Sequence, residues 1–208
     1  MKNLFVLLIA ILSAHAWAID FSNYNSALML QIVKEDNNKY ICSSVAYSQS
    51  KLITAAHCLE NATQVNVFKE FKILDNNTFY KTKTFYKSKL YNKNQSFFLN
   101  DVGIIELEES LPSEIKIYPI AQVKINQGEL HRVGFGMRNG INSRTVIWPI
   151  NQFQVHENYI EAWDQYSFYG DSGGPIFQLI DDKFYLIGIH STKDGNYTFN
   201  PLLAGDEI

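Results

Sequence analysis

The stretch Gly170-Asp171-Ser172-Gly173-Gly174-Pro175 places one serine among three glycines. Glycines in such number cost chain entropy that an ordinary loop avoids, which indicates a backbone held in close contacts or in left-handed conformations. A serine hydroxyl in this setting is a candidate nucleophile, although it needs a neighbouring base to take its proton. A glycine-rich turn without chemistry is the alternative. The rest of the chain decides between the two.

A candidate base stands earlier in the chain, in Ile53-Thr54-Ala55-Ala56-His57-Cys58. Histidine suits proton transfer because its ordinary pKa lies near neutral pH. A base also needs a group that orients its ring, and Asp101 offers a carboxylate just before an apolar run. The order His57, Asp101, Ser172 is the chymotrypsin order, and it differs from the orders of subtilisins and α/β-hydrolases.

These three segments resemble the trypsin/chymotrypsin family of serine proteases. The resemblance implies that Ser172 attacks a peptide carbonyl, that His57 transfers the proton, and that Asp101 fixes the histidine tautomer. It also implies an oxyanion hole made by the backbone N–H groups of Gly170 and Ser172. We expect peptide or protein substrates, with a protein inhibitor as a further class of partner, and a monomer. No cofactor is expected, and no metal, because the sequence holds no suitable cysteine–histidine cluster.

The first residues are typical of an export signal. Lys2 provides a positive start, residues 4–12 are apolar, and Ala16-Trp17-Ala18 fits a signal-peptidase site. A buried N-terminal helix is the alternative. We expect residues 1–18 to be a signal peptide, residues 19–208 to form the peptidase domain, and the protein to be secreted or periplasmic. No segment is long enough to span a membrane.

Charge and composition exclude some partners. The chain has 18 Lys and Arg against 21 Asp and Glu, a formal net charge of −3, which gives no reason to expect nucleic-acid binding. Aromatic residues and lysines interleave over 79–91, a composition that can stack bases. We favour the alternative, an exposed strand whose lysines protect its edge.

Short apolar or alternating runs between turn residues are typical of an all-β sandwich or barrel. We expect two six-stranded antiparallel β-barrels, about residues 19–115 and 116–208, with little helix beyond a turn starting at His57. Pro112 and Pro119 indicate the connection between them. The triad would lie between the barrels, with only its serine on the second. The expected strands are 27–33, 40–47, 51–55, 64–68, 79–86, 102–107, 128–134, 145–154, 175–178 and 184–190.

Cys42 and Cys58 are the two cysteines of the chain, and in an exported protein a disulfide is the default. The family has such a bridge beside the catalytic histidine, so here it would hold His57 against the preceding strand. A loop of this length would gain about 3 kcal/mol of stability in the chain-entropy model. A thiol ligand or a nucleophilic cysteine is the alternative.

The resemblance also predicts an activation pair. Cleavage after Ala18 would leave Ile19 as the N-terminus, and its ammonium would pair with Asp171 and shape the oxyanion hole. A buried carboxylate without a partner is costly, so Asp171 needs either that ammonium or local hydrogen bonds. Both alternatives stay open at this point.

Three positions describe the specificity pocket. Tyr166 stands where trypsins carry aspartate, so a basic side chain finds no anionic anchor. Ser167 and His190 are similar to the hydroxyl and the histidine with which glutamyl endopeptidases receive an acidic side chain, because both groups can donate hydrogen bonds to a carboxylate. In the alternative, His190 lies in the barrel core and Tyr166 fills the pocket, which would favour small or apolar residues.

The segment of Ser191, Thr192 and Lys193 would pair with extended substrate as an added strand. Lys193 stands where many family members have glycine, and Gly134-Phe135-Gly136 resembles the family's Gly-Trp-Gly. The chain departs from the family after residue 191: it lacks the closing helix, and Phe168 replaces one cysteine of a second bridge.

Two other functions remain open. A catalytically silent binding module would be indicated by loss of a triad residue, and none is lost. A hydrolase of esters or lipids would carry its serine in a strand–turn–helix elbow and its histidine last, whereas here the histidine comes first. A serine endopeptidase that prefers an acidic residue before the cleaved bond is therefore our expectation, with small or apolar preference as the alternative.

Overall fold

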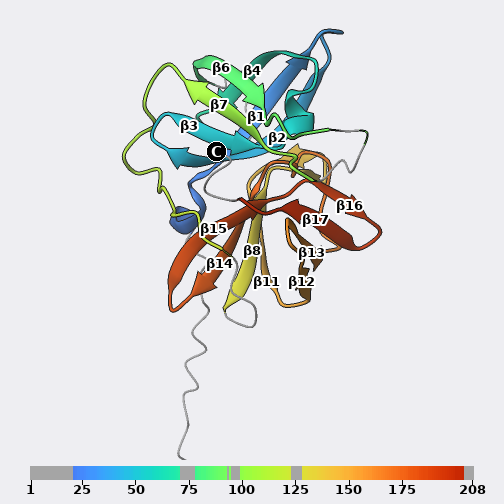
Figure 1. Ribbon diagram of the computed structural model, residues 1–208. Helices are drawn as coiled ribbons and strands as arrows, with labels where there is room; N and C mark the ends of the chain where they lie inside the picture. The colour runs from blue at the N-terminus through green and yellow to red at the C-terminus, as the bar shows by residue number, and fades with distance from the viewer. Residues whose placement is uncertain (1–20, 71–77, 93, 95–98, 123–127, 204–208) are drawn as a thin grey trace, which may run out of the picture.

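The computed structural model describes residues 21–70, 78–92, 94, 99–122 and 128–203. Its regular structure is almost entirely β, and its helices are the two single 3₁₀ turns η1 (Phe21–Tyr24) and η2 (Ala56–Leu59). Figure 1 shows two stacked bodies, with the blue-to-green strands above and the yellow-to-red strands below. The expected all-β class and the short turn at His57 are confirmed.

The first body is a sheet that closes on itself. Its strand order is β5-β4-β1-β2-β3-β7-β6, and every pair is antiparallel. Only Lys81 separates the two end strands, so β5 and β6 together act as one strand that joins β4 to β7, and the barrel has six strands in that sense. The strands are β1 (Ala27–Lys34), β2 (Lys39–Ser48), β3 (Lys51–Thr54), β4 (Ala62–Phe68), β5 (Phe79–Tyr80), β6 (Thr82–Lys87) and β7 (Gly103–Leu107).

The second body closes through two bent strands. It has two sheets, with strand orders β11-β8-β14-β15 and β12-β13-β17-β16. Strand β11 of the first sheet continues into β12 of the second after two residues, and β15 continues into β16 in the same way. A bridge between Gly188 and Leu202 joins the sheets again. The strands are β8 (Glu129–Gly134), β11 (Thr145–Ile150), β12 (Phe153–Val155), β13 (Tyr159–Trp163), β14 (Pro175–Ile180), β15 (Lys183–Ile189), β16 (Thr192–Asp194) and β17 (Tyr197–Pro201), beside a small hairpin of β9 (Met137–Arg138) and β10 (Ile141–Asn142).

The sequence-based strand assignment missed β13 and β17. In β17 the polar side chains of Thr198 and Asn200 face inward and are buried, while Tyr197 is exposed, so the usual alternation of polarity is reversed. This strand pairs with both β13 and β16 and completes the second barrel. The chain therefore keeps the barrel architecture well beyond residue 191.

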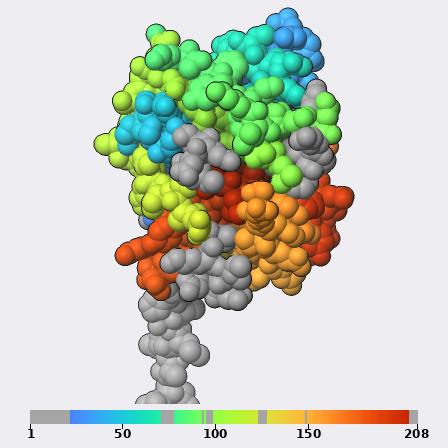
Figure 2. Space-filling view, in the orientation of Figure 1, coloured from blue at the N-terminus to red at the C-terminus, as the bar shows by residue number. Residues whose placement is uncertain are grey.

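One large apolar cluster spans both barrels. It joins Met29 and Leu52 of the first barrel to Phe177 and Leu186 of the second, and all four side chains are fully buried. Burial of each large apolar side chain contributes about 1.5–3 kcal/mol to the stability of the fold, so the shared cluster holds the two barrels together as one body. Figure 2 shows the two halves in contact across this face, with red atoms from late in the chain lying between green and orange ones.

Candidate active site

The His57 ring is held by Asp101. Nδ1 of His57 lies 2.7 Å from Oδ2 of Asp101, and the backbone N–H of His57 donates to Oδ1 at 2.8 Å. Asp101 is completely buried just before β7, whereas the histidine side chain keeps 36% exposure. A carboxylate that accepts from Nδ1 places the ring proton there, which leaves Nε2 free to take a proton.

Ser191 adds a third donor to Asp101, since its Oγ donates to Oδ2 at 2.5 Å. The sequence assigned Ser191 to substrate pairing alone, because nothing local indicates a contact between residues 90 positions apart. None of the three donors to Asp101 belongs to a lysine or an arginine, and together they fix the carboxylate in position.

The disulfide between Cys42 and Cys58 is confirmed, with a Cα–Cα distance of 6.4 Å. Since neither sulfur is free, the thiol alternatives are wrong. The bond ties the turn η2, which carries His57, to strand β2. Sγ of Cys58 lies 3.8 Å from His57 Nε2 and 3.9 Å from the carbonyl oxygen of Ser172, so the same sulfur touches both walls of the site.

The Ser172 hydroxyl donates to the carbonyl oxygen of Ser191 at 3.2 Å. Between these described side chains there is no hydrogen bond from Ser172 Oγ to His57 Nε2. Such bonds are often long or misaligned in a free enzyme and shorten when substrate binds. The structure thus brings His57, Asp101 and Ser172 to one place, with the serine hydroxyl turned aside.

The backbone before Ser172 presents two unpaired donors. The Tyr169 carbonyl accepts from the N–H of Met137 at 3.2 Å. This carbonyl and the Gly170 N–H belong to the same peptide unit, in which they point in opposite directions. The Gly170 N–H therefore points away from Met137. Gly170 has φ +102°, which favours glycine. Within the described segments neither the Gly170 nor the Ser172 N–H has a protein acceptor. Adjacent free donors of this kind can stabilise an oxyanion.

Ser43 of β2 holds this turn from the first barrel. Its Oγ donates to the Gly170 carbonyl at 2.7 Å and accepts from the N–H of Phe135 at 2.9 Å, while its own N–H donates to the Ser172 carbonyl at 2.7 Å. A Cβ at Gly173 would lie 2.2 Å from the Ser43 carbonyl, so this close approach requires glycine. Nothing in the sequence indicates this role of Ser43.

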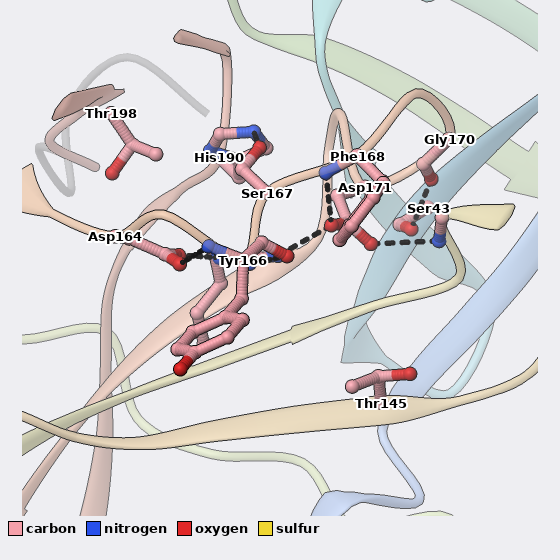
Figure 3. A network of polar contacts seen from close by, with 12 residues as sticks. Ser43, Thr145, Asp164, Tyr166, Ser167, Phe168, Gly170, Asp171, His190 and Thr198 are labelled. Atoms are coloured by element: carbon pink, nitrogen blue, oxygen red, sulfur yellow. Dashed lines mark hydrogen bonds and ion pairs between the residues drawn. The ribbon is translucent and has the colours of Figure 1, made fainter. Parts of the chain in front are cut away.

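Asp171 lies beside Phe168 in Figure 3, and its carboxylate pairs with two arginines. Oδ2 lies 2.9 Å from Nη1 of Arg132 and 2.7 Å from Nη2 of Arg138, and it accepts from the N–H of Phe168 at 2.9 Å. Oδ1 accepts from the N–H of Gly136 at 2.7 Å. Burial alone would raise the pKa of Asp171, but the charge of Arg132 and the hydrogen bonds and charge of Arg138 hold that pKa well below its usual range.

The predicted pair of Ile19 with Asp171 stays a prediction, because Ile19 lies outside the described residues, as does the predicted signal peptide. Asp171 has the local partners that were the alternative. Space for its carboxylate comes from the Gly-Phe-Gly segment, since a Cβ at Gly134 or Gly136 would lie 2.2 or 2.7 Å from Oδ1.

Arg132 is fully buried and forms a second ion pair, from Nε to Oδ2 of Asp164 at 2.5 Å. Its Nη2 donates to the Tyr166 carbonyl at 3.2 Å. Sequence reasoning missed this arginine, although a cation inside the apolar stretch around Val133 was a usable signal, because a buried charge requires partners.

The pocket wall differs from the expectation. Nε2 of His190 lies 2.8 Å from Oγ of Ser167, and Nδ1 lies 3.1 Å from Oδ1 of Asn200. Asn200 Nδ2 donates to the Ile160 carbonyl, so Oδ1 is the acceptor and His190 carries its proton on Nδ1. Burial and the charge of Arg132 lower the pKa of His190 to about 4. A neutral His190 therefore has no free N–H to offer a carboxylate, which corrects the predicted pair of donors.

Tyr166 does not fill the pocket, since its side chain is 52% exposed (Figure 3). His190 does lie in the interior, as the alternative proposed. On the opposite side, Lys193 Nζ donates to the Ser167 carbonyl at 3.0 Å. Its strand β16, which begins at Thr192, pairs with β17 on one side, and no described strand pairs with its other edge.

The chain forms two closed barrels, with a histidine–aspartate pair and a glycine-flanked serine at their junction. This is the arrangement of a trypsin-like fold. The model of the trypsin family matches residues 20–201, and the chain belongs to that family.

Solved structures agree at the level of the fold. An HL collagenase is 20% identical over 87% of this chain and 89% of its own, with a TM-score of 0.67. The scabies mite inactivated protease paralogue S-I1 is 14% identical over 88% of this chain and 91% of its own, with a TM-score of 0.66. No curated protein sequence matches the chain.

The described segments contain neither a candidate membrane-spanning helix nor a candidate metal centre. No helix there has the length and apolar character to cross a membrane, and no group of three or more histidine, cysteine or acidic side chains is arranged to hold a metal ion.

Proposed function

We propose that the chain is a serine endopeptidase in which Ser172, His57 and Asp101 hydrolyse peptide bonds through an acyl-enzyme. One observation carries the proposal: the buried Asp101 fixes a partly exposed His57 beside Ser172, and the N–H groups of Ser172 and Gly170 have no acceptor among the described residues.

The chemistry follows from these positions. Ser172 Oγ rotates from the Ser191 carbonyl and attacks the substrate carbonyl carbon, while Nε2 of His57 takes its proton. The N–H groups of Gly170 and Ser172 bind the resulting oxyanion. His57 then gives the proton to the leaving amine, and water repeats the sequence on the acyl-enzyme. Asp101 stabilises the imidazolium in each half of the reaction.

The free edge of β16 supports a polypeptide substrate. Ser191, Thr192 and Lys193 would hydrogen-bond an extended chain through their backbone, as an added strand. We further propose that the protein is exported through residues 1–18, which agrees with the disulfide.

For the residue before the cleaved bond we propose an acidic side chain. Both carboxylates near the pocket, Asp164 and Asp171, are already paired with Arg132, so a basic side chain finds no free anion. The Ser167 hydroxyl can turn from His190 to a substrate carboxylate. Preference for small or apolar residues is the alternative.

A fluorophosphonate probe tests the proposed nucleophile. We expect the purified protein to be labelled, and Ser172→Ala and His57→Ala to lose labelling. Ser110→Ala is a matched control, because Ser110 is an exposed serine that is not part of the site and should leave labelling unchanged. Equal labelling of Ser172→Ala and the wild type would contradict the assignment.

A catalytically silent module is the second candidate. The hydroxyl of Ser172 is hydrogen-bonded to the Ser191 carbonyl and not to His57. The fold is also shared with an inactivated protease paralogue. In that case the wild-type protein is not labelled and no peptide is cleaved.

A further inference from the structure

Lys193 reaches across the mouth of the pocket. It extends from the edge strand β16, and its ammonium donates to the carbonyl of Ser167 on the opposite wall. Behind that contact the side chains of Ser167 and His190 are almost completely buried. A side chain that enters from the cleft would therefore meet the Lys193 ammonium before it meets the hydroxyl and the imidazole.

The charge of Lys193 is uncompensated. Arg132 and Arg138 are neutralised by Asp164 and Asp171, two cations against two anions. In the described part of the chain no carboxylate lies within ion-pair distance of the Lys193 ammonium. Its neutral carbonyl partner is the weaker kind of acceptor for a cation.

We infer that Lys193 is the residue that selects an acidic substrate side chain, by exchanging the Ser167 carbonyl for the carboxylate of the residue before the cleaved bond. The inference rests on the proposed endopeptidase function. It differs from the assignment of that role to His190, whose two nitrogens are already occupied by Ser167 and Asn200.

The exchange is physically accessible. The lysine stem is flexible and its ammonium has three rotatable donors, so the group can leave one acceptor for another without movement of the backbone. The new contact is a charge-assisted hydrogen bond, which is shorter and about twice as strong as one to a neutral acceptor. A basic side chain would meet a like charge at the mouth, and an uncharged one would displace the ammonium from Ser167 without giving it a charged partner.

Paired peptide substrates that carry Glu or Gln before the cleaved bond test this inference, because they differ in charge at nearly constant shape. The variants are Lys193→Met, which keeps the length of the stem without charge, and Lys193→Arg, which keeps the charge. Lys183→Met is the matched control, because Lys183 is exposed at the start of β15, at the end of that strand opposite to His190. All are compared by kcat/KM and by fluorophosphonate labelling.

We expect the wild type to prefer Glu over Gln by about 10- to 100-fold, the range for hydrogen bonds to charged groups. Lys193→Met should bring that ratio near one, because cleavage after Glu should fall much further than cleavage after Gln. Lys193→Arg and Lys183→Met should keep the preference. A wild-type ratio near one, or an unchanged ratio in Lys193→Met, would overturn the inference, whereas absence of labelling in the wild type would instead refute the endopeptidase.

Discussion

Two buried aspartates stand at the junction of the barrels, and they are held in opposite ways. Asp101 accepts three hydrogen bonds, two from His57 and one from Ser191, and none from a lysine or an arginine. Asp171 has two arginines and two backbone N–H groups. A carboxylate without a permanent cation can stabilise the charge that His57 gains during proton transfer. A carboxylate already paired with cations can only hold its loop in shape.

The difference predicts separate consequences for the two sites. Changes at Asp101 should affect turnover and leave the fold intact, because the imidazole of His57 and the hydroxyl of Ser191 can rearrange around an amide of the same size. Changes around Asp171 should affect stability, because its partners include a buried charge that would lose its counter-ion.

The largest expected effect is that of Asp101→Asn on turnover. The amide keeps the volume of the carboxylate but favours the wrong tautomer of His57, which costs about 10⁴ in kcat. Steady-state kinetics measure the loss, and unfolding in urea should show little change. Asp36→Asn, at an exposed turn, is the control and should not alter kcat. A loss of less than about tenfold, or 1.4 kcal/mol, would argue against the role of Asp101.

Next in size is the effect of Arg132→Met on stability. The substitution leaves Asp164 without its ion pair and Asp171 with one arginine, both buried, which costs about 3–5 kcal/mol of unfolding free energy. Urea unfolding measures it. Arg138→Met should cost less, because Arg138 keeps 18% exposure and water can replace it. Equal losses for the two variants would show that burial of the ion pair is not what matters.

A smaller effect is expected from the titration of His190. Its folded pKa of about 4 lies below the ordinary 6.5, so the unfolded chain takes up a proton first as the pH falls. The stability from the neutral ring is full above pH 6.5 and decreases between pH 6.5 and 4, by about 3 kcal/mol in total. Burial also lowers the pKa of His131, which adds to the same slope.

Urea unfolding at pH 7 and pH 4.5 measures this dependence in the wild type and in His190→Gln. The variant should show a clearly smaller difference between the two pH values, with the remainder due to His131. An equal difference in both proteins would mean that His190 is not buried as a neutral group.

The smallest effect is expected from an extension of the N-terminus. Arg132 and Arg138 already supply positive charge to Asp171, so a residue added before Ile19 should leave kcat/KM nearly unchanged. Kinetics of the extended and the processed protein measure it. A loss of tenfold or more on extension would support the predicted pair of Ile19 with Asp171, and would show that the arginines alone do not order the oxyanion hole.

Local sequence was sufficient for the parts of the site that depend on local chemistry. The serine among glycines, the histidine beside its cysteine and the aspartate before an apolar run each carry their signal within a few residues. The short alternating strands and the Cys42–Cys58 bond could be predicted for the same reason. Strand β17 was missed because its buried residues, Thr198 and Asn200, are polar, so that hydrophobic periodicity gave no indication of it.

Spacing, glycine content and residue type were enough to predict the all-β class and the candidate triad, and the resemblance of the three motifs was enough to predict the family. The partners that surround the triad became visible in the folded chain. The arginines at Asp171, the Ser43 contacts with the turn, the Ser191 hydroxyl on Asp101 and the reach of Lys193 to Ser167 all join residues at least 26 positions apart. Contacts at that range are set by how the two barrels close and pack, and no local pattern encodes that geometry.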